Sequence, residues 1–282
     1  PVDLSAIAGG TGGFVVNGQA GTDYSGWSVA SAGDVNGDGL DDLIIGAYNF
    51  DPTSASNGGR SYVVFGKCSG TAVDLSAVAA GSGGFVIDGQ SANDYSGYSV
   101  ASAGDVNGDG LDDLVIGAYG ASPTGISTGG KSYVVFGKAN TSAVKLSAVA
   151  GGTGGFVING QSTTDNSGYS VSAAGDVNGD GLGDLILGAY NSDPYGVTNA
   201  GRSYLIYGRT GSASIDLSNL AASNGFVIAG ESSSDNSGVS VASAGDVNGD
   251  GYDDLLVGAY YADPGATARS SAGKTYLIYG GA

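Results

Sequence analysis

The chain has 282 residues, 41% of them hydrophobic, which suits a folded domain with a sizeable core and excludes a disordered acidic tail. Its formal net charge of −18 disfavours nucleic acid and anionic membrane surfaces as partners, because phosphate contacts need Lys and Arg. With no His and a single cysteine, Cys68, the chain cannot use Ser-His-Asp catalysis or form an internal disulfide. No apolar run reaches the roughly 20 residues of a membrane span, and no signal peptide is recognisable at Pro1, which indicates a mature or excised chain.

The first quarter of the chain predicts one helical turn and four strands. Asp3 or Ser5 is the expected cap of a helical turn in DLSAIA. Residues 14–18 (FVVNG) form a short β-branched segment, and residues 27–32 (WSVASA) alternate as a strand with two different faces does. After an acidic loop, residues 42–48 (DLIIGAY) form the apolar run of a strand buried on both faces. Residues 61–66 (SYVVFG) alternate aromatic and aliphatic side chains.

The same series returns three more times, so the chain is four copies of one unit. The acidic loops begin at Asp34, Asp105, Asp176 and Asp246, at spacings of 71, 71 and 70 residues. Abundant Gly, Ser, Thr, Val and Tyr indicate an all-β chain with many turns. Four strands per unit at a fixed period are typical of a β-propeller blade, whereas the coils of a parallel β-helix are much shorter.

We predict that each blade takes its outermost strand from the next unit, so that residues 14–19 complete the last blade and close the ring. Small residues of the inner strand, such as Ala30 and Ala32, favour a narrow ring of four blades. An eight-bladed ring from two chains is the alternative, and we accordingly expect a monomer, with a dimer as the alternative. The predicted single domain, 1–282, has blades at about 24–90, 95–161, 166–231, and 236–282 plus 14–19.

The acidic loops predict calcium sites. Oxygen-bearing side chains stand at loop positions 1, 3, 5 and 9, glycine stands at position 6, and position 7 offers a backbone carbonyl. Calcium prefers six to eight such oxygens. We predict one Ca²⁺ per loop, with ligands Asp34, Asn36, Asp38, Leu40 and Asp42; Asp105, Asn107, Asp109, Leu111 and Asp113; Asp176, Asn178, Asp180, Leu182 and Asp184; and Asp246, Asn248, Asp250, Tyr252 and Asp254.

Two details separate these loops from other acidic turns. Position 12 is Ile45 rather than the bidentate Glu of an EF-hand. Position 8 is Asp in the first, second and fourth loops and Gly183 in the third, which indicates that position 8 is not a ligand. A solvated hairpin turn rich in Asn-Gly and Asp-Gly is the competing interpretation. It does not account for four ligand positions kept in register four times.

The motif S-G-[WYV]-S-V-x-x-A-G-D-V-N-G-D-G-x-x-D-L, with S-Y-[VL]-[VI]-[FY]-G downstream, resembles the FG-GAP repeat of the integrin alpha-subunit propeller over essentially the whole chain. The resemblance implies an extracellular propeller that binds calcium in these loops. The near-identical copies also resemble bacterial secreted, adhesin-like FG-GAP arrays. The chain departs from the family at its Phe-Gly and Gly-Ala-Pro motifs, where Ser25 replaces the Phe and Tyr48 replaces the Pro.

Three functions are compatible with this scaffold. The first is a calcium-stabilised, non-enzymatic adhesion or protein-interaction module, secreted or at the cell surface, with a protein or glycan ligand. The second is a lectin that uses Trp27, Tyr98 and Tyr169, for which core packing is the competing role. The third is a secreted hydrolase or lyase, but no unrepeated constellation of side chains indicates a catalytic or organic-cofactor site. Recognition is expected in the variable loops, where drift is the competing explanation; these are 49–59, 120–130, 191–201 and 261–273.

Overall fold

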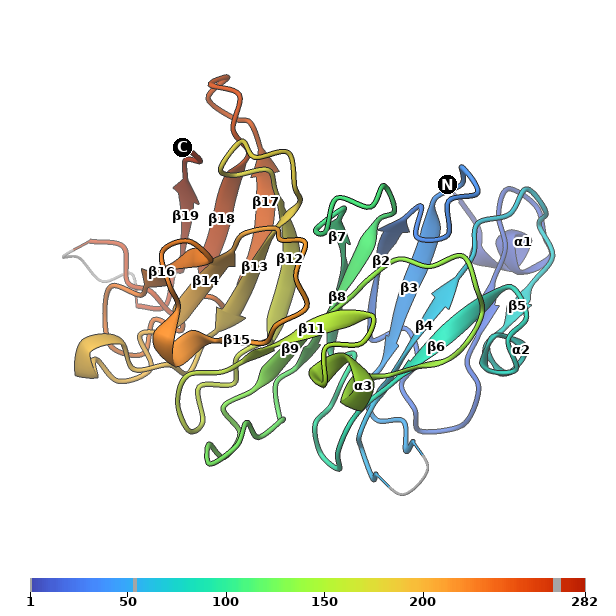
Figure 1. Cartoon of the computed structure of the whole chain (residues 1–282), viewed down its shortest axis with the longest axis horizontal. Helices are drawn as coiled ribbons and strands as arrows, with labels where there is room; N and C mark the ends of the chain where they lie inside the picture. The colour runs from blue at the N-terminus through green and yellow to red at the C-terminus, as the bar shows by residue number, and fades with distance from the viewer. Residues whose placement is uncertain (1, 53–54, 266–269, 282) are drawn as a thin grey trace.

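The computed structural model describes residues 2–52, 55–265 and 270–281 and consists mainly of β-strands and turns (Figure 1). Four antiparallel sheets follow one another along the chain, one for each repeat, and we call them blades 1 to 4. Blade 1 lies on the right of Figure 1 and blade 4 on the left. The all-β prediction and the repeated sheets are therefore confirmed.

Each blade is built in the predicted order, from an inner strand outward. The inner strands are β2 (Ser28–Gly33), β7 (Ser99–Gly104), β12 (Ser170–Gly175) and β17 (Ser240–Gly245). The second strands are β3 (Asp42–Ala47), β8 (Asp113–Ala118), β13 (Asp184–Ala189) and β18 (Asp254–Ala259). The third strands are β4 (Arg60–Val64), β9 (Lys131–Val135), β14 (Arg202–Ile206) and β19 (Lys274–Ile278). The outer strands of blades 1 to 3 come from the next repeat, as predicted, and are β6 (Gly84–Asp88), β11 (Gly155–Asn159) and β16 (Gly225–Ala229).

Short connecting elements precede each outer strand. They are β5 (Val73–Asp74), β10 (Val144–Lys145) and β15 (Ile215–Asp216), with helices α1 (Leu4–Ala8), α2 (Leu75–Ala79), α3 (Leu146–Ala150) and η2 (Leu217–Asn219). One further short helix, η1 (Pro194–Gly196), lies in the loop between β13 and β14. The predicted cap is present: the Asp3 carboxylate accepts a hydrogen bond from the Ser5 N–H at 2.9 Å. Asp74 caps α2 in the same way.

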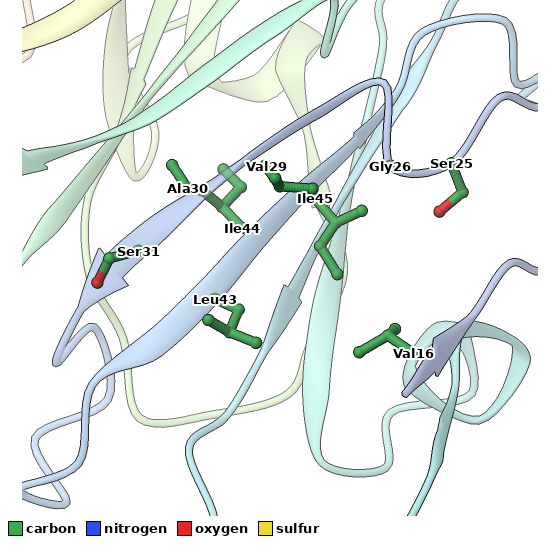
Figure 2. A pocket seen from close by; sticks show the side chains of 9 residues that line it. All are labelled: Val16, Ser25, Gly26, Val29, Ala30, Ser31, Leu43, Ile44 and Ile45. Carbon is green, nitrogen blue, oxygen red and sulfur yellow. The ribbon is translucent and has the colours of Figure 1, made fainter. Parts of the chain in front are cut away.

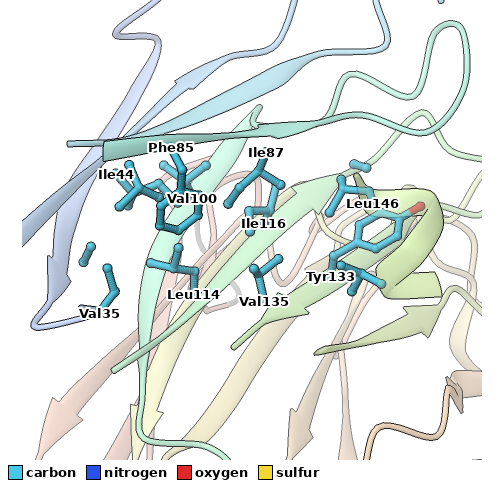
Figure 3. Packing of buried hydrophobic residues seen from close by; sticks show 14 of the residues in the cluster. Val35, Ile44, Phe85, Ile87, Val100, Leu114, Ile116, Tyr133, Val135 and Leu146 are labelled. Atoms are coloured by element: carbon cyan, nitrogen blue, oxygen red, sulfur yellow. The ribbon is translucent and has the colours of Figure 1, made fainter. Parts of the chain in front are cut away.

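The hydrophobic core lies between the blades as well as within them. Ile44 and Phe85 of blade 1 belong to one buried cluster with Val100, Leu114 and Ile116 of blade 2 (Figure 3). A similar cluster joins blade 2 to blade 3, and another joins blade 3 to blade 4. Blades 2 and 3 therefore each contribute one face to the core before them and one face to the core after them.

The predicted closure of the ring by residues 14–19 is wrong for this structure. The N-terminal strand β1 (Val16–Asn17) pairs in parallel with β5, and among the described residues β19 pairs only with β18. The outer strands β6 and β11 make the same parallel pairing with β10 and β15. Thus β1 lies where an outer strand lies, but it is held on the blade 1 side. The fourth predicted blade, 236–282 plus 14–19, is not one sheet.

The blades form an open series. The inner strands contact their neighbours in chain order, β2 with β7, β7 with β12 and β12 with β17, and β17 makes no comparable contact with β2 in the described parts of the chain. The repeated packing between blades carries blade 4 away from blade 1 instead of back onto it. The arrangement is consistent with consecutive blades of a β-propeller, but the four sheets do not close into a ring in the described residues.

Candidate metal-binding loops

Each acidic loop joins the inner strand of a blade to its second strand, and its position 1 carboxylate organises the turn. The Asp34 Oδ1 atom accepts hydrogen bonds from the N–H groups of Gly37 and Asp38 at 2.8 and 3.1 Å, and Oδ2 accepts one from Gly39 at 2.8 Å. These bonds, Gly39 first, lower the pKa of Asp34. The other three loops repeat the same three bonds.

Positions 3 and 5 are joined to each other. The Asn36 amide nitrogen donates to the Asp38 carboxylate at 3.0 Å, and the Asn36 amide oxygen accepts from the Asp38 N–H at 2.8 Å. The Leu40 N–H donates to Asp38 Oδ1 at 2.9 Å. Gly37 and Gly39 have φ angles of 77° and 85°, so positions 4 and 6 both need glycine's freedom. The sequence had identified this requirement at position 6 alone.

Position 9 supplies a buried carboxylate. Asp42, Asp113, Asp184 and Asp254 are each 0% exposed. In the first loop, Asp42 accepts hydrogen bonds from the N–H groups of Val35 and Gly66 at 3.1 and 2.7 Å. Burial, with a smaller contribution from the carboxylates at positions 5 and 1 of the same loop, raises the pKa of Asp42 and Asp184 to about 6 and that of Asp113 to about 7.

No cation accompanies these buried carboxylates in the described residues. The ion pairs there are Arg60 with Asp88, Arg202 with Asp165 and Lys274 with Glu231, and none involves an acidic loop. A buried carboxylate without a cationic partner is unfavourable unless another positive charge is supplied. Each loop therefore combines the oxygen donors that calcium prefers with a position 9 carboxylate whose charge is uncompensated.

The loop geometry is not that of a finished metal centre. In the described parts of the chain, no three His, Cys, Asp or Glu side chains form a group that could hold a metal ion. One reason is chemical, because position 3 is Asn in every loop. Another is that the position 1 and 5 carboxylates are engaged by the loop's own N–H groups. The residue types fit calcium, and ligation would require these carboxylates to share their oxygens between the turn and the ion.

Positions 7 and 8 reach toward the preceding blade. The side chains of Leu111 and Leu182 lie beside Gly37 and Gly108 of the loop before their own. At position 8, Asp112 accepts a hydrogen bond from the Asp34 N–H at 2.8 Å, and Asp253 accepts one from Asp176 at the same distance. The sequence predicted that position 8 is not a ligand but missed this bond between blades.

Gly183 explains the one exception at position 8. A Cβ atom at Gly183 would lie 2.6 Å from the carbonyl oxygen of Ala103 in blade 2, closer than real Cβ atoms approach. The Gly183 N–H donates to the Asp105 carbonyl at 2.9 Å, the same backbone bond that Asp112 and Asp253 make at the other two interfaces. Blades 2 and 3 thus approach each other at this point through backbone alone. The signal in the sequence was the single replacement of Asp by Gly at an otherwise acidic position.

A second series of buried carboxylates was missed entirely. It stands in the turn before each inner strand, where the four Asp side chains are 4–8% exposed. Asp94 accepts a hydrogen bond from the Ser91 N–H at 3.0 Å, and burial raises its pKa to about 6. The sequence signal is an Asp that precedes [YN]-S-G in every repeat. The members of the series are Asp23, Asp94, Asp165 and Asp235.

The aromatic residues considered for sugar binding pack against one another. The ring centroids of Trp27 and Tyr98 are 5.5 Å apart, and those of Tyr98 and Tyr169 are 4.9 Å apart. The hydroxyls of Tyr98 and Tyr169 are 3.0 Å apart and form a hydrogen bond. Tyr48 and Tyr119 lie edge-on to the same rings. The row therefore connects neighbouring blades, which supports the packing role.

The variable loops connect the second and third strands of the blades. Tyr195, in the loop 191–201, is 93% exposed and has a φ angle of 54°. Residues 53–54 and 266–269, which belong to the first and last of the predicted recognition loops, lie outside the described residues. No helix in the described parts of the chain is long and apolar enough to cross a membrane.

The fold and its loops define an all-β repeat protein in which every blade carries one acidic turn between its first two strands. The family model described as "FG-GAP repeat" matches four segments, which together make up more than half of the chain. The chain belongs to the FG-GAP repeat family. The matched segments are 25–64, 96–135, 167–206 and 237–278.

Individual relatives are similar over much of the chain. Integrin alpha-PS2 of Drosophila melanogaster is 30% identical over 85% of this chain and 15% of its own length. Integrin alpha-V of Gallus gallus is 29% identical over 88% of this chain and 21% of its own. Phosphatidylinositol-glycan-specific phospholipase D of Bos taurus is 34% identical over 58% of this chain and 18% of its own. The chain thus spans about a fifth or less of the length of these relatives.

Proposed function

We propose that the chain is a calcium-stabilised FG-GAP propeller module that mediates adhesion or protein interaction outside the cell or at its surface. The observation that carries the calcium part is the buried position 9 carboxylate, which recurs four times at 0% exposure without a cationic side chain. Bound calcium would supply the missing positive charge. In the first loop, Asp34, Asn36, Asp38 and Asp42, with the Leu40 carbonyl, would hold the ion.

The adhesion part rests on the relatives. Two of the similar proteins are integrin alpha chains, which match most of this chain. The chain corresponds to a small part of each of them, so the identity of any ligand does not transfer. The variable loops are the proposed contact surface because they differ among repeats that otherwise agree. We also propose a non-enzymatic role; the activity named for the phospholipase D relative does not transfer, because the match covers only 18% of that protein's length.

The lectin alternative is less well supported than protein interaction. Sugar stacking needs aromatic faces that are free, whereas Tyr98 and Tyr169 are in contact with each other and with neighbouring tyrosines. A glycan array in calcium buffer separates the two alternatives. Saturable binding that is lost in Trp27→Ala would favour the lectin, and binding to immobilised extracellular-matrix proteins without glycan binding would favour the interaction module.

Calorimetric titration of the chelator-treated protein with CaCl₂ tests the metal sites. We expect four ions per chain and a higher Tm in calcium, because ligands that bind the folded state stabilise it. Asp42→Asn should reduce the number to three. Asp41→Asn is the matched control: it removes the adjacent carboxylate, at position 8, and should keep all four ions. A Tm that is the same in calcium and in chelator would contradict the proposal.

A further inference from the structure

The first and last blades each have one face that no neighbouring blade covers; on blade 1, helix α2 buries Tyr62, Val64 and Val86 of that face but leaves Val29 open. We call the exposed face of blade 1 the head face and the exposed face of blade 4 the tail face. On the head face, Val29 is 66% exposed, although its counterpart Val100 is 5% exposed beneath blade 1. On the tail face, Val247 is 57% exposed and Leu277 is 41% exposed. Their counterparts in blades 1 to 3 are at most 2% exposed, and these are Val35, Val106, Val177, Val63, Val134 and Leu205.

The three interfaces inside the chain share one set of hydrogen bonds. Between blades 1 and 2, three of these bonds run from N–H groups of blade 2 to groups at the inner end of blade 1, in addition to bonds from the turn before β7 to the loop before β4. Val100 donates to the Ser28 hydroxyl at 3.1 Å, Asp112 to the Asp34 carbonyl at 3.2 Å and Lys138 to the Val35 carbonyl at 2.7 Å. The equivalent bonds join blade 2 to blade 3 and blade 3 to blade 4. Two of the three interfaces add the position 8 carboxylate bond.

The head and tail faces carry the two halves of this same set. The head face has three donors, which are the N–H groups of Val29, Asp41 and Lys67. It also has one acceptor, the Asp41 carboxylate. The tail face has three acceptors, which are the Ser240 hydroxyl and the carbonyls of Asp246 and Val247. It also has one donor, the Asp246 N–H. Within the described residues, none of these groups has a partner in another blade. Every group on one face therefore has a complement on the other.

The edge strands complement each other in the same way. In blade 1, β6 pairs antiparallel with β4, and Ile87 stands opposite Ser61. The corresponding strands at the two ends are β1 and β19, which would place Val16 opposite Thr275. Beside β1 the head face has an apolar hollow of about 500 Å³, where Val16 lies across from Leu43 and Ile45 (Figure 2). On the tail face, Leu256 and Leu277 are apolar as well. Their equivalents in blades 1 and 3 are buried against the next blade.

We propose that the tail face of one copy binds the head face of a second copy, and that two copies close into a ring of eight blades. The contact joins different faces, so it is heterologous and produces a ring only if the rotation closes. Propellers have typically four to eight blades. Two four-bladed chains reach the upper end of that range, whereas three chains would exceed it.

One glycine makes the proposed interface testable without disturbing the fold. A Cβ atom at Gly117 would overlap the carbonyl oxygen of Gly168 in the next blade, and the same holds for Gly46 and Gly188 against their neighbours. At the equivalent Gly258 of blade 4, the nearest atom would be 3.5 Å away. Gly258→Ala is therefore harmless within one chain and would clash with Gly26 of a second copy.

Light scattering with size-exclusion chromatography, and sedimentation velocity, test the proposal in calcium buffer. The buffer needs about 0.15 M salt, because two chains of charge −18 repel each other at low ionic strength. We expect the unmodified chain to have twice its monomer mass. Gly258→Ala on the tail face and Val29→Asp on the head face should both be monomers, with unchanged circular dichroism spectra.

Mixing the two variants gives the sharpest result. Gly258→Ala keeps its head face and Val29→Asp keeps its tail face, so the mixture should form a dimer through one interface. A monomeric unmodified chain at high concentration would overturn the proposal and leave further blades of a longer chain as the occupant. Dimers of Gly258→Ala alone would show a head-to-head contact and also overturn it. A series of trimers and larger species would overturn the closed two-copy ring.

Discussion

Blades 2 and 4 contain almost the same acidic turn in different surroundings. Val106 and Val247 both stand in the sequence GDVNGDG, yet Val106 is 0% exposed and Val247 is 57% exposed. Blade 3 covers the first of them, and no blade in the described residues covers the second. The difference shows that burial in this protein is decided by the neighbouring blade and not by the local sequence, as expected of repeats whose stability depends on contacts between neighbours.

The comparison also indicates where contacts between blades contribute most to the stability of the fold. The middle blades share buried clusters with a neighbouring blade on both faces, whereas blades 1 and 4 each do so on one face, and the other face of blade 1 packs against helix α2. The same substitution should therefore lower the free energy of unfolding more at a position between two blades than at the equivalent position on an open face. Urea denaturation of each pair in the Val29→Asp background, in calcium, would test this, because that background removes the proposed pairing of copies from the result.

The largest difference is expected at the glycines of the second strands. Gly117→Ala should destabilise the fold by about 3 kcal/mol, the upper end of overpacking costs, because its methyl group meets the backbone of Gly168. Gly258→Ala should change the free energy of unfolding by less than about 0.5 kcal/mol. Equal losses at the two positions would show that the methyl group disturbs its own strand and that the neighbouring blade does not matter.

A smaller difference is expected at two leucines of the third strands. Leu205 is 0% exposed and Leu277, its counterpart in blade 4, is 41% exposed. Leu205→Ala should cost about 3 kcal/mol through lost burial and a residual cavity, and Leu277→Ala about 1 kcal/mol. A similar cost at both sites would mean that the tail face is covered in solution even when Val29→Asp blocks the head face of other copies.

The position 8 carboxylates give a third pair. Asp112→Ala should cost about 1–2 kcal/mol, because the part-buried Asp34 N–H loses its acceptor. Asp41→Ala should cost less than about 0.5 kcal/mol, since Asp41 faces no other blade in the described residues.

Gly183→Asp is the reverse test: it should destabilise the fold, because a side chain there meets the Ala103 carbonyl. Stabilisation by Gly183→Asp would show that blades 2 and 3 are farther apart than the structure places them.

Sequence reasoning worked where the information is local. The strand from Ser28 to Gly33 and the strand from Asp42 to Ala47 lie within a residue or so of their predicted bounds, since periodicity and turn residues decide them. The origin of each outer strand in the next repeat also followed from the order of segments. The predicted closure into a four-bladed ring is absent from the structure. It could not be derived from the sequence, because near-identical repeats carry no information about the rotation from one blade to the next.

The candidate site was predicted in the same uneven way. The ligand series follows from spacing, and the structure adds the burial of the Asp42 carboxylate. The bond between Asp112 and the preceding blade depends on a distance between blades, which no spacing along the chain records. Asp94 was missed because an Asp beside Tyr, Ser and Gly looks like an exposed turn residue, although its side chain is 5% exposed.

The smallest predicted effect concerns pH and the two ends of the buried Asp series. Burial raises the pKa of Asp94 to about 6, and burial also raises that of Asp235, beside the opposing charge of Lys274. A raised folded pKa favours the protonated carboxyl. Its contribution to stability is therefore full below the unfolded pKa and is lost as the pH rises through about 6. Asn mimics the neutral form, so Asp94→Asn should gain stability relative to the unmodified chain as the pH rises.

Thermal melts at about pH 5 and about pH 7.5 measure this gain as the Tm of Asp94→Asn minus that of the unmodified chain. Taking the difference removes the contribution of the acidic loops, which titrate equally in both proteins. We expect the difference to increase by a few degrees between the two pH values, and to increase less for Asp235→Asn in the last repeat. A difference that falls as the pH rises would show that the Asp94 carboxylate is stabilised as the anion, and that its turn is more open to water than its 5% exposure indicates.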